Sequence, residues 1–314
     1  MAHNRAGEPV VSVVIPARDA QDSLPATLRA LDRQTLAAPF EVIVVDNGSL
    51  DATADVAARM GARVVKRRRG EGPGAARNEG AANARAPVLA FTDADCEPDG
   101  RWLSAGLAAL ESADIASGRI EPVRSPGPFD RSLSVVVATG LFESANLFVR
   151  RSAFTIAGGF PTGLEGPGAA PFGEDALFGW TAVRAGARSA FAEDAIVRHA
   201  VFQRSAGGYL GELRRLDLFP ELVRRAPEVR EAFLYRRLFL TRRTAAFDLA
   251  AAGVLACVVT RRPWGLAAAA PYLRLVDTDR RLLGRLPAVV RGFGDVVGAA
   301  ALLAGSARSR CLVL

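Results

Sequence analysis

The sequence predicts an α/β protein with a mostly parallel β-sheet, helices on both faces of that sheet, and a helical region at its C-terminal end. Three observations carry this prediction. Apolar, β-branched runs alternate with helical patterns through the first hundred residues. These runs are continuously apolar, which is typical of parallel strands buried on both faces. Beyond Leu216 the chain reads as apolar helices flanked by arginines.

Four strands are expected in the first hundred residues, with a helix after each of the first three. The expected strands are VVSVVIP (10–16), FEVIVVD (40–46), ARVV (62–65) and PVLAF (87–91). The expected helices are SLPATLRALDRQ, DATADVAARM and GAARNEGAANAR. Asp22 or Ser23 is expected to cap the first helix and Asp51 the second, and Pro87 ends the third.

The middle of the chain, from about residue 115 to 205, is richer in glycine and proline. SGRIEPV (117–123) and SANLFVRR (144–151) read as strands, and AFAEDAIVRHAV (190–201) reads as one strand or a strand pair. The helix DALFGWTAVRAG follows the loop GPGAAPFGED. These elements extend the sheet beyond its first four strands.

The charge of the 314 residues is +7 and is unevenly placed. Residues 216–314 hold 16 arginines against 8 acidic residues, a balance of +8, so the rest of the chain is nearly neutral. A basic, apolar segment suits an anionic membrane or nucleic acid. It shows neither interleaved base-stacking aromatics nor a known nucleic-acid module, so nucleic acid is not an expected partner.

The three cysteines, Cys96, Cys257 and Cys311, are far apart and form no CxxC pair. Neither a zinc site nor a disulfide framework is indicated, and a reducing compartment fits. The N-terminal stretch MAHNRAGEP has no apolar core and does not read as a signal peptide. We therefore expect a cytoplasmic protein, placed at the inner face of the cell membrane if the C-terminal region binds lipid.

Two carboxylates, Asp93 and Asp95, directly follow the strand PVLAF. In a strand-like conformation they would point the same way, and protonation, an arginine or a divalent cation would have to relieve their repulsion. Hard cations such as Mg²⁺ or Mn²⁺ prefer oxygen ligands and often bridge to a diphosphate. The competing interpretation is a solvated turn in which Asp99 caps the next helix.

Asp46 and Arg77 are candidate nucleotide contacts. Asp46 ends a strand without starting a helix, so its carboxylate is free to accept hydrogen bonds from a base or a ribose. Arg77 follows a glycine-rich loop at a helix start, where it could fork onto a phosphate. The loop is neither GxxxxGK[ST] nor GxGxxG, and a solvated arginine-rich loop is the alternative.

Glu174 and Asp175 lie where a glycine-rich loop meets a helix. Asp175 either caps that helix or acts as a general base near an acceptor hydroxyl. His199 lies near the end of an apolar run. A histidine there is usually packed, but beside a metal it is a plausible nitrogen ligand.

In order and spacing, these motifs resemble the family 2 glycosyltransferases, which have the GT-A fold. The resemblance covers roughly Pro9 to Ala200. Each motif is weak alone, but the ordered set is highly specific. It consists of VSVVIPARD, EVIVVDNGSLDAT, GPGAARNEGAANARAPVLAFTDADCEPD, SANLFVRRSAFTIAGGF, GEDALFGWTAVRAG and VRHA.

The resemblance implies an inverting transferase that moves a sugar from a nucleotide-diphosphate sugar to an acceptor hydroxyl. Residues 1–114 would be the half of the GT-A domain that binds the nucleotide sugar, and residues 115–215 the half that binds the acceptor. Residues 216–314 would be a basic helical region. Neither the donor nor the acceptor is identified by the motifs.

The resemblance also assigns roles to single residues. Pro16, Asp19 and Asp46 would line the base and ribose pocket. Arg77 would lie near the nucleotide, and Asp93 would meet the ribose or the metal.

The remaining roles concern the metal and the acceptor. Asp95 would hold Mg²⁺ or Mn²⁺, and His199 would be a further contact to the metal or the diphosphate. Asp175 would be the catalytic base.

Three departures from the family pattern blur which base and which sugar are bound. Ala17-Arg18-Asp19 stands where the family often has asparagine, and Asn47 replaces the second aspartate of Asp-Asp-Gly-Ser. An arginine common after the Glu-Asp motif is absent.

Two other functions compete with this interpretation. A sugar nucleotidyltransferase would show a GxGxR pattern after the first strand, and Pro16-Ala17-Arg18 has no glycine. A non-catalytic binding module for nucleotide sugars would have lost acidic residues that this chain keeps.

The C-terminal region admits several interpretations. Its stretch TAAFDLAAAGVLACVVT (244–260) is shorter than the about 20 residues of a spanning helix and contains Asp248. A helical lid, a homodimer face and a shallow membrane anchor that uses arginines on anionic lipid are the alternatives. A multi-span membrane domain is the least favoured.

Overall fold

The computed structural model describes residues 7–68, 71–161, 163–164 and 172–314. The chain forms two units, which are described separately below. The α/β unit contains the residues up to Ser125 together with Ser132–Val201, and the helical unit contains Pro126–Arg131 with Phe202–Leu314. Parts of two predicted loops lie outside the described residues. They are positions 69–70 in the glycine-rich loop before Arg77 and positions 166–171 in the loop before Asp175.

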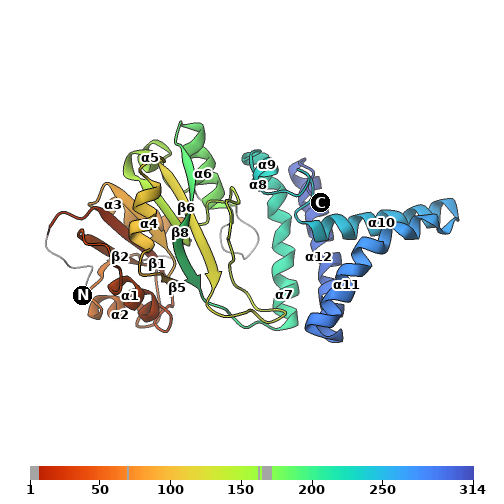
Figure 1. Ribbon diagram of the computed structural model, residues 1–314, viewed down its shortest axis with the longest axis horizontal. Coiled ribbons are helices and arrows are strands. Elements are labelled where there is room, and N and C mark those ends of the chain that lie inside the picture. Colours follow the sequence, from red (N-terminus) through yellow and green to blue (C-terminus); the bar gives the residue numbers. More distant parts are fainter. Residues whose placement is uncertain (1–6, 69–70, 162, 165–171) are drawn as a thin grey trace. The chain divides into compact units, whose positions relative to one another are not determined.

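The α/β unit is built on one eight-stranded sheet of order β3-β2-β1-β4-β7-β6-β8-β5 (Figure 1). The first four strands in this order are parallel, β7 is antiparallel to both neighbours, β6 and β8 are parallel, and β5 is antiparallel to β8. The strands are β1 Val11–Ala17, β2 Phe40–Asp46, β3 Arg63–Lys66, β4 Val88–Thr92, β5 Cys96–Pro98, β6 Ile115–Pro122, β7 Asn146–Arg150 and β8 Ser189–His199. The predicted mostly parallel sheet is confirmed.

Helices cover both faces of the sheet because alternate strand residues face opposite sides. Val13 and Ile15 of β1 belong to a core with α1 and α4, whereas Val14 belongs to a second core with α3, α5 and α6. The helices of this unit are α1 Leu24–Asp32, α2 Thr53–Arg59, α3 Pro73–Asn83, α4 Trp102–Ala109, α5 Arg151–Ile156 and α6 Glu174–Arg184.

The segment after β4 differs from the prediction. Residues 93–95 are not strand-like but form a turn, in which the amide of Cys96 donates to the carbonyl of Asp93 at 3.2 Å. The chain then enters β5, a three-residue strand that the sequence did not predict. Because the turn separates the directions of the side chains, Asp93 and Asp95 have different partners, which are described below.

Asn146 fixes the centre of the sheet. Its side chain is fully buried, accepts a hydrogen bond from Trp102 Nε1 at 2.8 Å, and donates to the carbonyls of Arg119 and Ala195 at 2.8 and 2.7 Å. Those carbonyls flank the register shift between β6 and β8. A satisfied buried amide therefore holds the strand that ends at His199.

Gly106 of α4 provides a test of the packing between α4 and the sheet. A Cβ atom at this position would lie 2.2 Å from the ring of Phe148, which is fully buried. We expect Gly106→Ala to lower the free energy of unfolding by about 1–2 kcal/mol, because the clash outweighs the ~1 kcal/mol gain in helix propensity. Urea denaturation measures the change.

The control for this prediction is Gly100→Ala, where the nearest atom to an added Cβ is 3.4 Å away. Equal effects of the two substitutions would contradict the proposed clash.

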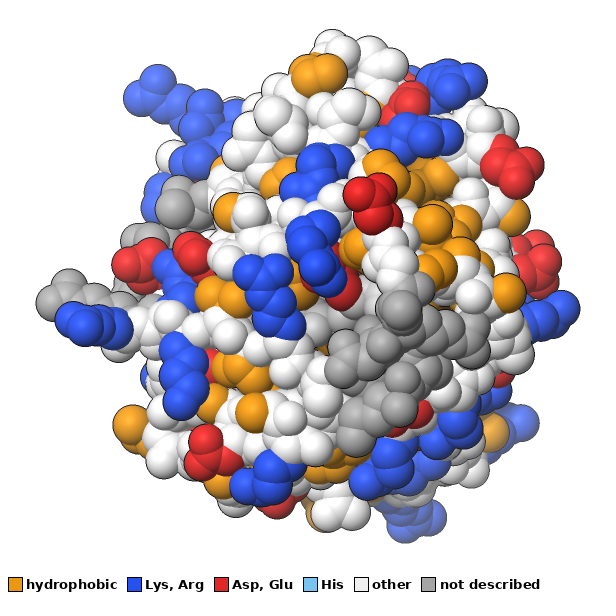
Figure 2. All heavy atoms as spheres, turned by 90° about the vertical axis from the view of Figure 1, so that its left-hand side faces the viewer, with side chains coloured by type: hydrophobic (Ala, Val, Ile, Leu, Met, Phe, Trp, Pro, Cys, Tyr) orange, Lys and Arg blue, Asp and Glu red, His pale blue; other side chains and the backbone are white. Residues whose placement is uncertain are grey.

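The surface of the molecule at the left-hand side of Figure 1 carries mixed charges. Figure 2 shows arginine and lysine side chains interspersed with acidic and apolar ones on this face. Among the described residues, charges of both signs are therefore mixed on this face.

The helical unit is held by ion pairs that link three of its helices. Arg243 of α10 pairs with Asp279 of α11 at 2.6 Å and with Asp295 of α12 at 2.7 Å. The hydroxyl of Tyr272 donates to Asp295 at 2.8 Å, and Arg291 pairs with Asp279 at 3.2 Å. The unit contains α7 Ala206–Leu213, η2 Arg214–Leu218, α8 Phe219–Arg225, α9 Val229–Ala232, α10 Arg242–Thr260, η3 Pro263–Ala269, α11 Ala270–Leu283 and α12 Arg285–Ser309. By length and composition alone, α10 and α12 are each apolar and long enough to cross a membrane.

Candidate active site

The carboxyl ends of β1 and β2 bring two of the predicted residues together. Asp46 ends β2 opposite Ala17, and its Oδ1 accepts a hydrogen bond from the amide of Ser49 at 3.0 Å. The hydroxyl of Ser49 in turn accepts from the amide of Asp19 at 3.0 Å. Ser49 thus joins the loops that carry Asp19 and Asp46, while Pro16 precedes Ala17 on β1.

Asp19 has a structural role in this loop pair. Its backbone has a positive φ of 48°, and its Oδ1 accepts from the amide of Leu50 at 2.8 Å. Short polar side chains tolerate this conformation because they bond to nearby backbone. The predicted contact of Asp19 with a nucleotide stays a prediction.

Arg77 of α3 lies at the centre of a cluster of three carboxylates. Its Nη2 is 2.7 Å from Asp93 Oδ1, and its Nη1 is 3.6 Å from Glu174 Oε1 and 3.7 Å from Asp175 Oδ1. The ring of Phe160 packs 5.6 Å from its guanidinium carbon. The arginine is 4% exposed, so one buried cation joins the turn after β4 to the start of α6.

Burial and charge act against each other in this cluster. Burial disfavours the charged form of Arg77, but the charges of Asp93, Asp175 and Glu174 outweigh it and raise the pKa of the arginine. Burial, and then the charge of Asp175, raise the pKa of Glu174. Burial also raises the pKa of Asp175, against the opposing effects of Arg77 and of hydrogen bonds from Ser144. A carboxylate with a raised pKa is a stronger base.

Asp175 does not cap α6. Gly173 is the N-cap residue and Asp175 lies in the first turn. Its Oδ2 accepts hydrogen bonds from both the amide and the hydroxyl of Ser144, at 2.9 and 2.8 Å. Its Oδ1 is buried with no hydrogen-bond partner among the described residues. One oxygen is therefore held while the other keeps its capacity to accept a proton.

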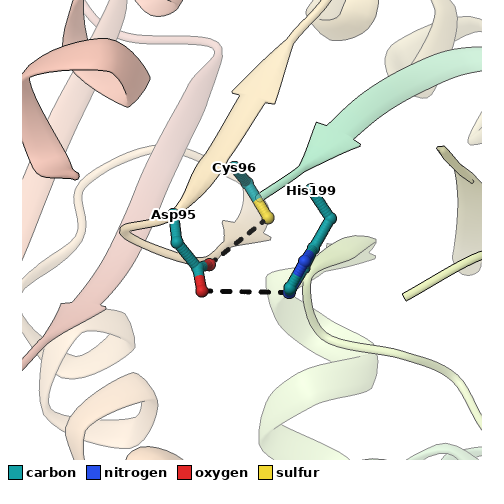
Figure 3. Close-up of side chains that lie close together, drawn as sticks. All are labelled: Asp95, Cys96 and His199. Atoms are coloured by element: carbon teal, nitrogen blue, oxygen red, sulfur yellow. Dashed lines mark hydrogen bonds and ion pairs between the residues drawn. The ribbon is translucent and has the colours of Figure 1, made fainter. Parts of the chain in front are cut away.

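Asp95, Cys96 and His199 form a second cluster where β5 pairs with the end of β8 (Figure 3). His199 Nε2 lies 3.9 Å from Asp95 Oδ2, and Cys96 Sγ lies 3.8 Å from Asp95 Oδ1. His199 Nδ1 lies 2.7 Å from the carbonyl oxygen of Ala200. Because a carbonyl only accepts hydrogen bonds, Nδ1 is assigned the proton, and Nε2 is the nitrogen that faces Asp95.

The donor atoms of this cluster fit a divalent cation in part. A carboxylate oxygen and an imidazole nitrogen suit Mg²⁺ or Mn²⁺, and the bond from Nδ1 to a backbone carbonyl is the usual way to orient a ligating imidazole. Cys96 does not fit, because burial and then the charges of Asp93 and Asp95 raise the pKa of its thiol well above the ordinary value. Asp95 and His199 are the two candidate ligands.

Comparison with known proteins identifies the family. The profile described as Glycosyl transferase family 2 matches residues 12–163. Residues 12–163 form a family 2 glycosyltransferase domain. The matched segment runs from β1 to just beyond α5 and includes Arg77, Asp93 and Asp95.

Related glycosyltransferases match different lengths of the chain. Glycosyltransferase AglE of Haloferax volcanii is 29% identical over 209 residues, which are 61% of this chain and 67% of AglE. An uncharacterized glycosyltransferase of Mycobacterium tuberculosis is 42% identical over 114 residues, which are 36% of this chain and 50% of that protein. The matched part of the chain thus spans half to two thirds of these relatives.

Solved structures show the same GT-A fold. Mannosyltransferase PcManGT from Pyrobaculum calidifontis, in complex with GDP-Man and Mn²⁺, is 20% identical, with a TM-score of 0.58 over 97% of this chain and 88% of that chain. S. aureus TarS 1-349 in complex with UDP-GlcNAc is 17% identical, with a TM-score of 0.55 over 96% of this chain and 92% of that chain. The predicted fold class is confirmed.

Sequence reasoning missed two residues of this glycosyltransferase site. The sequence places Ser144 only at the start of a strand. Its hydroxyl can donate a hydrogen bond, but no pattern in the sequence indicates that Asp175 is the partner. Phe160 is the last residue of the motif SANLFVRRSAFTIAGGF, but the motif gives it no role of its own. Asn78 holds it in place, with its amide donating to the Phe160 carbonyl at 2.7 Å and its oxygen accepting from the Phe160 amide at 2.8 Å.

Arg77 has an unexpected environment. The sequence predicted a fork onto a phosphate or a solvated loop, and the guanidinium is neither solvated nor directed at open space. A buried arginine that faces three carboxylates orients those carboxylates. The predicted contact of Arg77 with the nucleotide stays a prediction.

Proposed function

We propose that this family 2 glycosyltransferase moves a sugar from a nucleotide-diphosphate sugar to an acceptor hydroxyl with inversion at the anomeric carbon. One observation carries the proposal: the Arg77 guanidinium contacts both Asp93 of the Asp-x-Asp segment and Asp175 of α6. Asp93, proposed to contact the sugar donor, and Asp175, proposed as the base, therefore both lie next to the Arg77 side chain. The structures of PcManGT in complex with GDP-Man and of TarS 1-349 in complex with UDP-GlcNAc support this class of donor.

Asp175 is the proposed catalytic base. Its Oδ2 is held by Ser144, so Oδ1 takes the proton of the acceptor hydroxyl as that oxygen attacks the anomeric carbon. The bond from the anomeric carbon to the diphosphate oxygen breaks, and the nucleoside diphosphate leaves with the bonding electrons. A single displacement from the opposite face inverts the configuration.

The donor side is proposed from the strand ends. Pro16, Asp19 and Asp46 would contact the base and ribose, and Asp93 the ribose. Asp95 and His199 would hold Mg²⁺ or Mn²⁺, which stabilises the negative charge on the leaving diphosphate.

The function is tested by incubating the protein with a panel of sugar nucleotides and candidate acceptors. Release of free nucleoside diphosphate is expected. A nucleotidyltransferase would instead consume nucleoside triphosphate and release pyrophosphate, and a binding module would bind the sugar nucleotide without releasing product.

Asp95→Ala is expected to abolish the dependence of nucleotide-sugar binding on Mn²⁺, because it removes the carboxylate of the candidate metal site. A thermal shift measures binding with and without Mn²⁺. Ligand at 100 times its Kd should stabilise the wild type by roughly 2.7 kcal/mol.

Cys96→Ala is the matched control for Asp95→Ala. Its thiol is fully buried and is not a proposed ligand, so the Mn²⁺ dependence should persist in this variant. A response to Mn²⁺ in Asp95→Ala that equals the wild-type response would remove Asp95 from the proposed site.

A further inference from the structure

The C-terminal half of α10 and the following η3 form a tightly packed helical hairpin. A Cβ atom on Gly253 would lie 2.3 Å from the carbonyl oxygen of Gly265, and one on Gly265 would lie 2.3 Å from that of Gly253. The two backbones are therefore in direct contact. Figure 1 shows this end of α10 projecting away from α12 within the helical unit.

The surface of the hairpin is apolar and exposed. Six large apolar side chains on it are each 48–74% exposed: Val254, Leu255, Val258, Val259, Trp264 and Leu266. The tip between the two helices carries Arg261 and Arg262, both exposed. A soluble surface rarely gathers so many exposed apolar side chains without a partner.

Charge distinguishes the hairpin from the rest of the unit. Residues 249–276 contain three arginines and no acidic residue. The acids of the neighbouring helices are used at the base of the hairpin, where Arg243 pairs with Asp279 and Asp295. The arginines of the tip thus have no carboxylate within their own segment, and an anionic partner would complement them.

We propose that the hairpin of residues 254–266 docks onto an anionic lipid bilayer. Its apolar side chains enter the boundary between headgroups and acyl chains, with Trp264 at the depth that tryptophan prefers. Arg261 and Arg262 contact the phosphates of the headgroups. The apolar tip of residues 254–266 is shorter than the about 20 residues that cross a bilayer, so the tip itself lies in the interface and does not span it.

A lipid surface fits this charge pattern better than a second copy of the chain does. In a two-fold dimer the same patch meets itself, which would bring the arginine pairs of two tips together with no acid between them. Headgroup phosphates supply the missing negative charge, and their attraction is screened by salt.

The test is flotation of the full chain with phosphatidylcholine vesicles that contain or lack 30 mol% phosphatidylserine (about a third anionic lipid, as suits a surface-charge effect). Binding is expected only to the anionic vesicles and should weaken as salt rises. Arg261→Gln combined with Arg262→Gln should weaken binding about thirtyfold, since each arginine near the surface contributes about fivefold. The control is Arg280→Gln with Arg281→Gln on α11, which removes the same charge away from the hairpin and should keep binding.

Tryptophan fluorescence gives a second readout, because Trp264 is exposed whereas Trp102 is buried and Trp180 is half-buried. Quenching by brominated lipid is expected in the wild type and should be lost in Trp264→Phe. The proposal is overturned if the protein does not bind anionic vesicles at low salt, or if both arginine pairs weaken binding equally. Self-association that the Arg261→Gln and Arg262→Gln pair strengthens, measured by sedimentation without lipid, would assign the hairpin to a second copy instead.

Discussion

Asp175→Asn should lower the rate of sugar transfer by at least about a hundredfold, the low end for loss of a general base, and should leave nucleotide-sugar binding intact. The amide oxygen of asparagine still accepts both hydrogen bonds from Ser144, so the side chain stays in place. It has no basic oxygen to take the acceptor proton. Steady-state kinetics with the identified donor and acceptor, beside donor binding by calorimetry, separate the two effects.

Glu174→Gln is the matched control for Asp175→Asn. Both carboxylates approach Arg77 Nη1, Glu174 at 3.6 Å and Asp175 at 3.7 Å. Glu174→Gln therefore removes the same charge from the same cluster. Its transfer rate should stay far above that of Asp175→Asn. The reverse order of rates would make Glu174 the base, and equal losses would point to the charge balance of the cluster instead of a base.

Arg77→Met should lower the free energy of unfolding by about 3–5 kcal/mol, the range for removing one partner from a buried ion pair. Methionine fills similar space but leaves Asp93, Glu174 and Asp175 without their shared cation. Arg77→Lys is the control, because it keeps the charge and should recover part of the loss. Urea denaturation followed by tryptophan fluorescence measures all three proteins.

The destabilisation in Arg77→Met should depend on pH. The pKa values of Glu174 and Asp175 are already raised in the folded protein, and loss of the arginine raises them further. A folded state with raised carboxyl pKa values binds more protons than the unfolded state, so its stability falls as pH rises through those values. The difference from the wild type should therefore be smaller at pH 5 than at pH 8. A difference that grows toward acid pH would mean that the cluster is not held by Arg77.

Local patterns were enough to predict most of the elements of the α/β unit. β2 has the predicted bounds, and β1, β3 and β4 are each shifted by one residue at both ends. A buried strand and an amphipathic helix each leave a period in the sequence that does not depend on distant residues. Capping was predicted less well. Ser23 makes no side-chain cap bond to α1. The N-cap residue of α2 is Ala52 and not Asp51, although Asp51 accepts a hydrogen bond from the amide of Thr53 at 2.9 Å.

The sequence by itself determined the sheet and, through the order of its motifs, the family. It also identified Asp93, Asp95, Asp175 and His199 as the candidate carboxylates and imidazole of the site. Tertiary structure alone decided which of these side chains meet. Arg77 faces carboxylates from segments 16 and about 97 positions further along the chain, and Arg243 finds its acids on two other helices. The turn at residues 93–95 turned Asp93 toward Arg77 and Asp95 toward His199. Such pairings depend on how whole strands and helices pack across long separations, and no periodicity within a single segment encodes that packing.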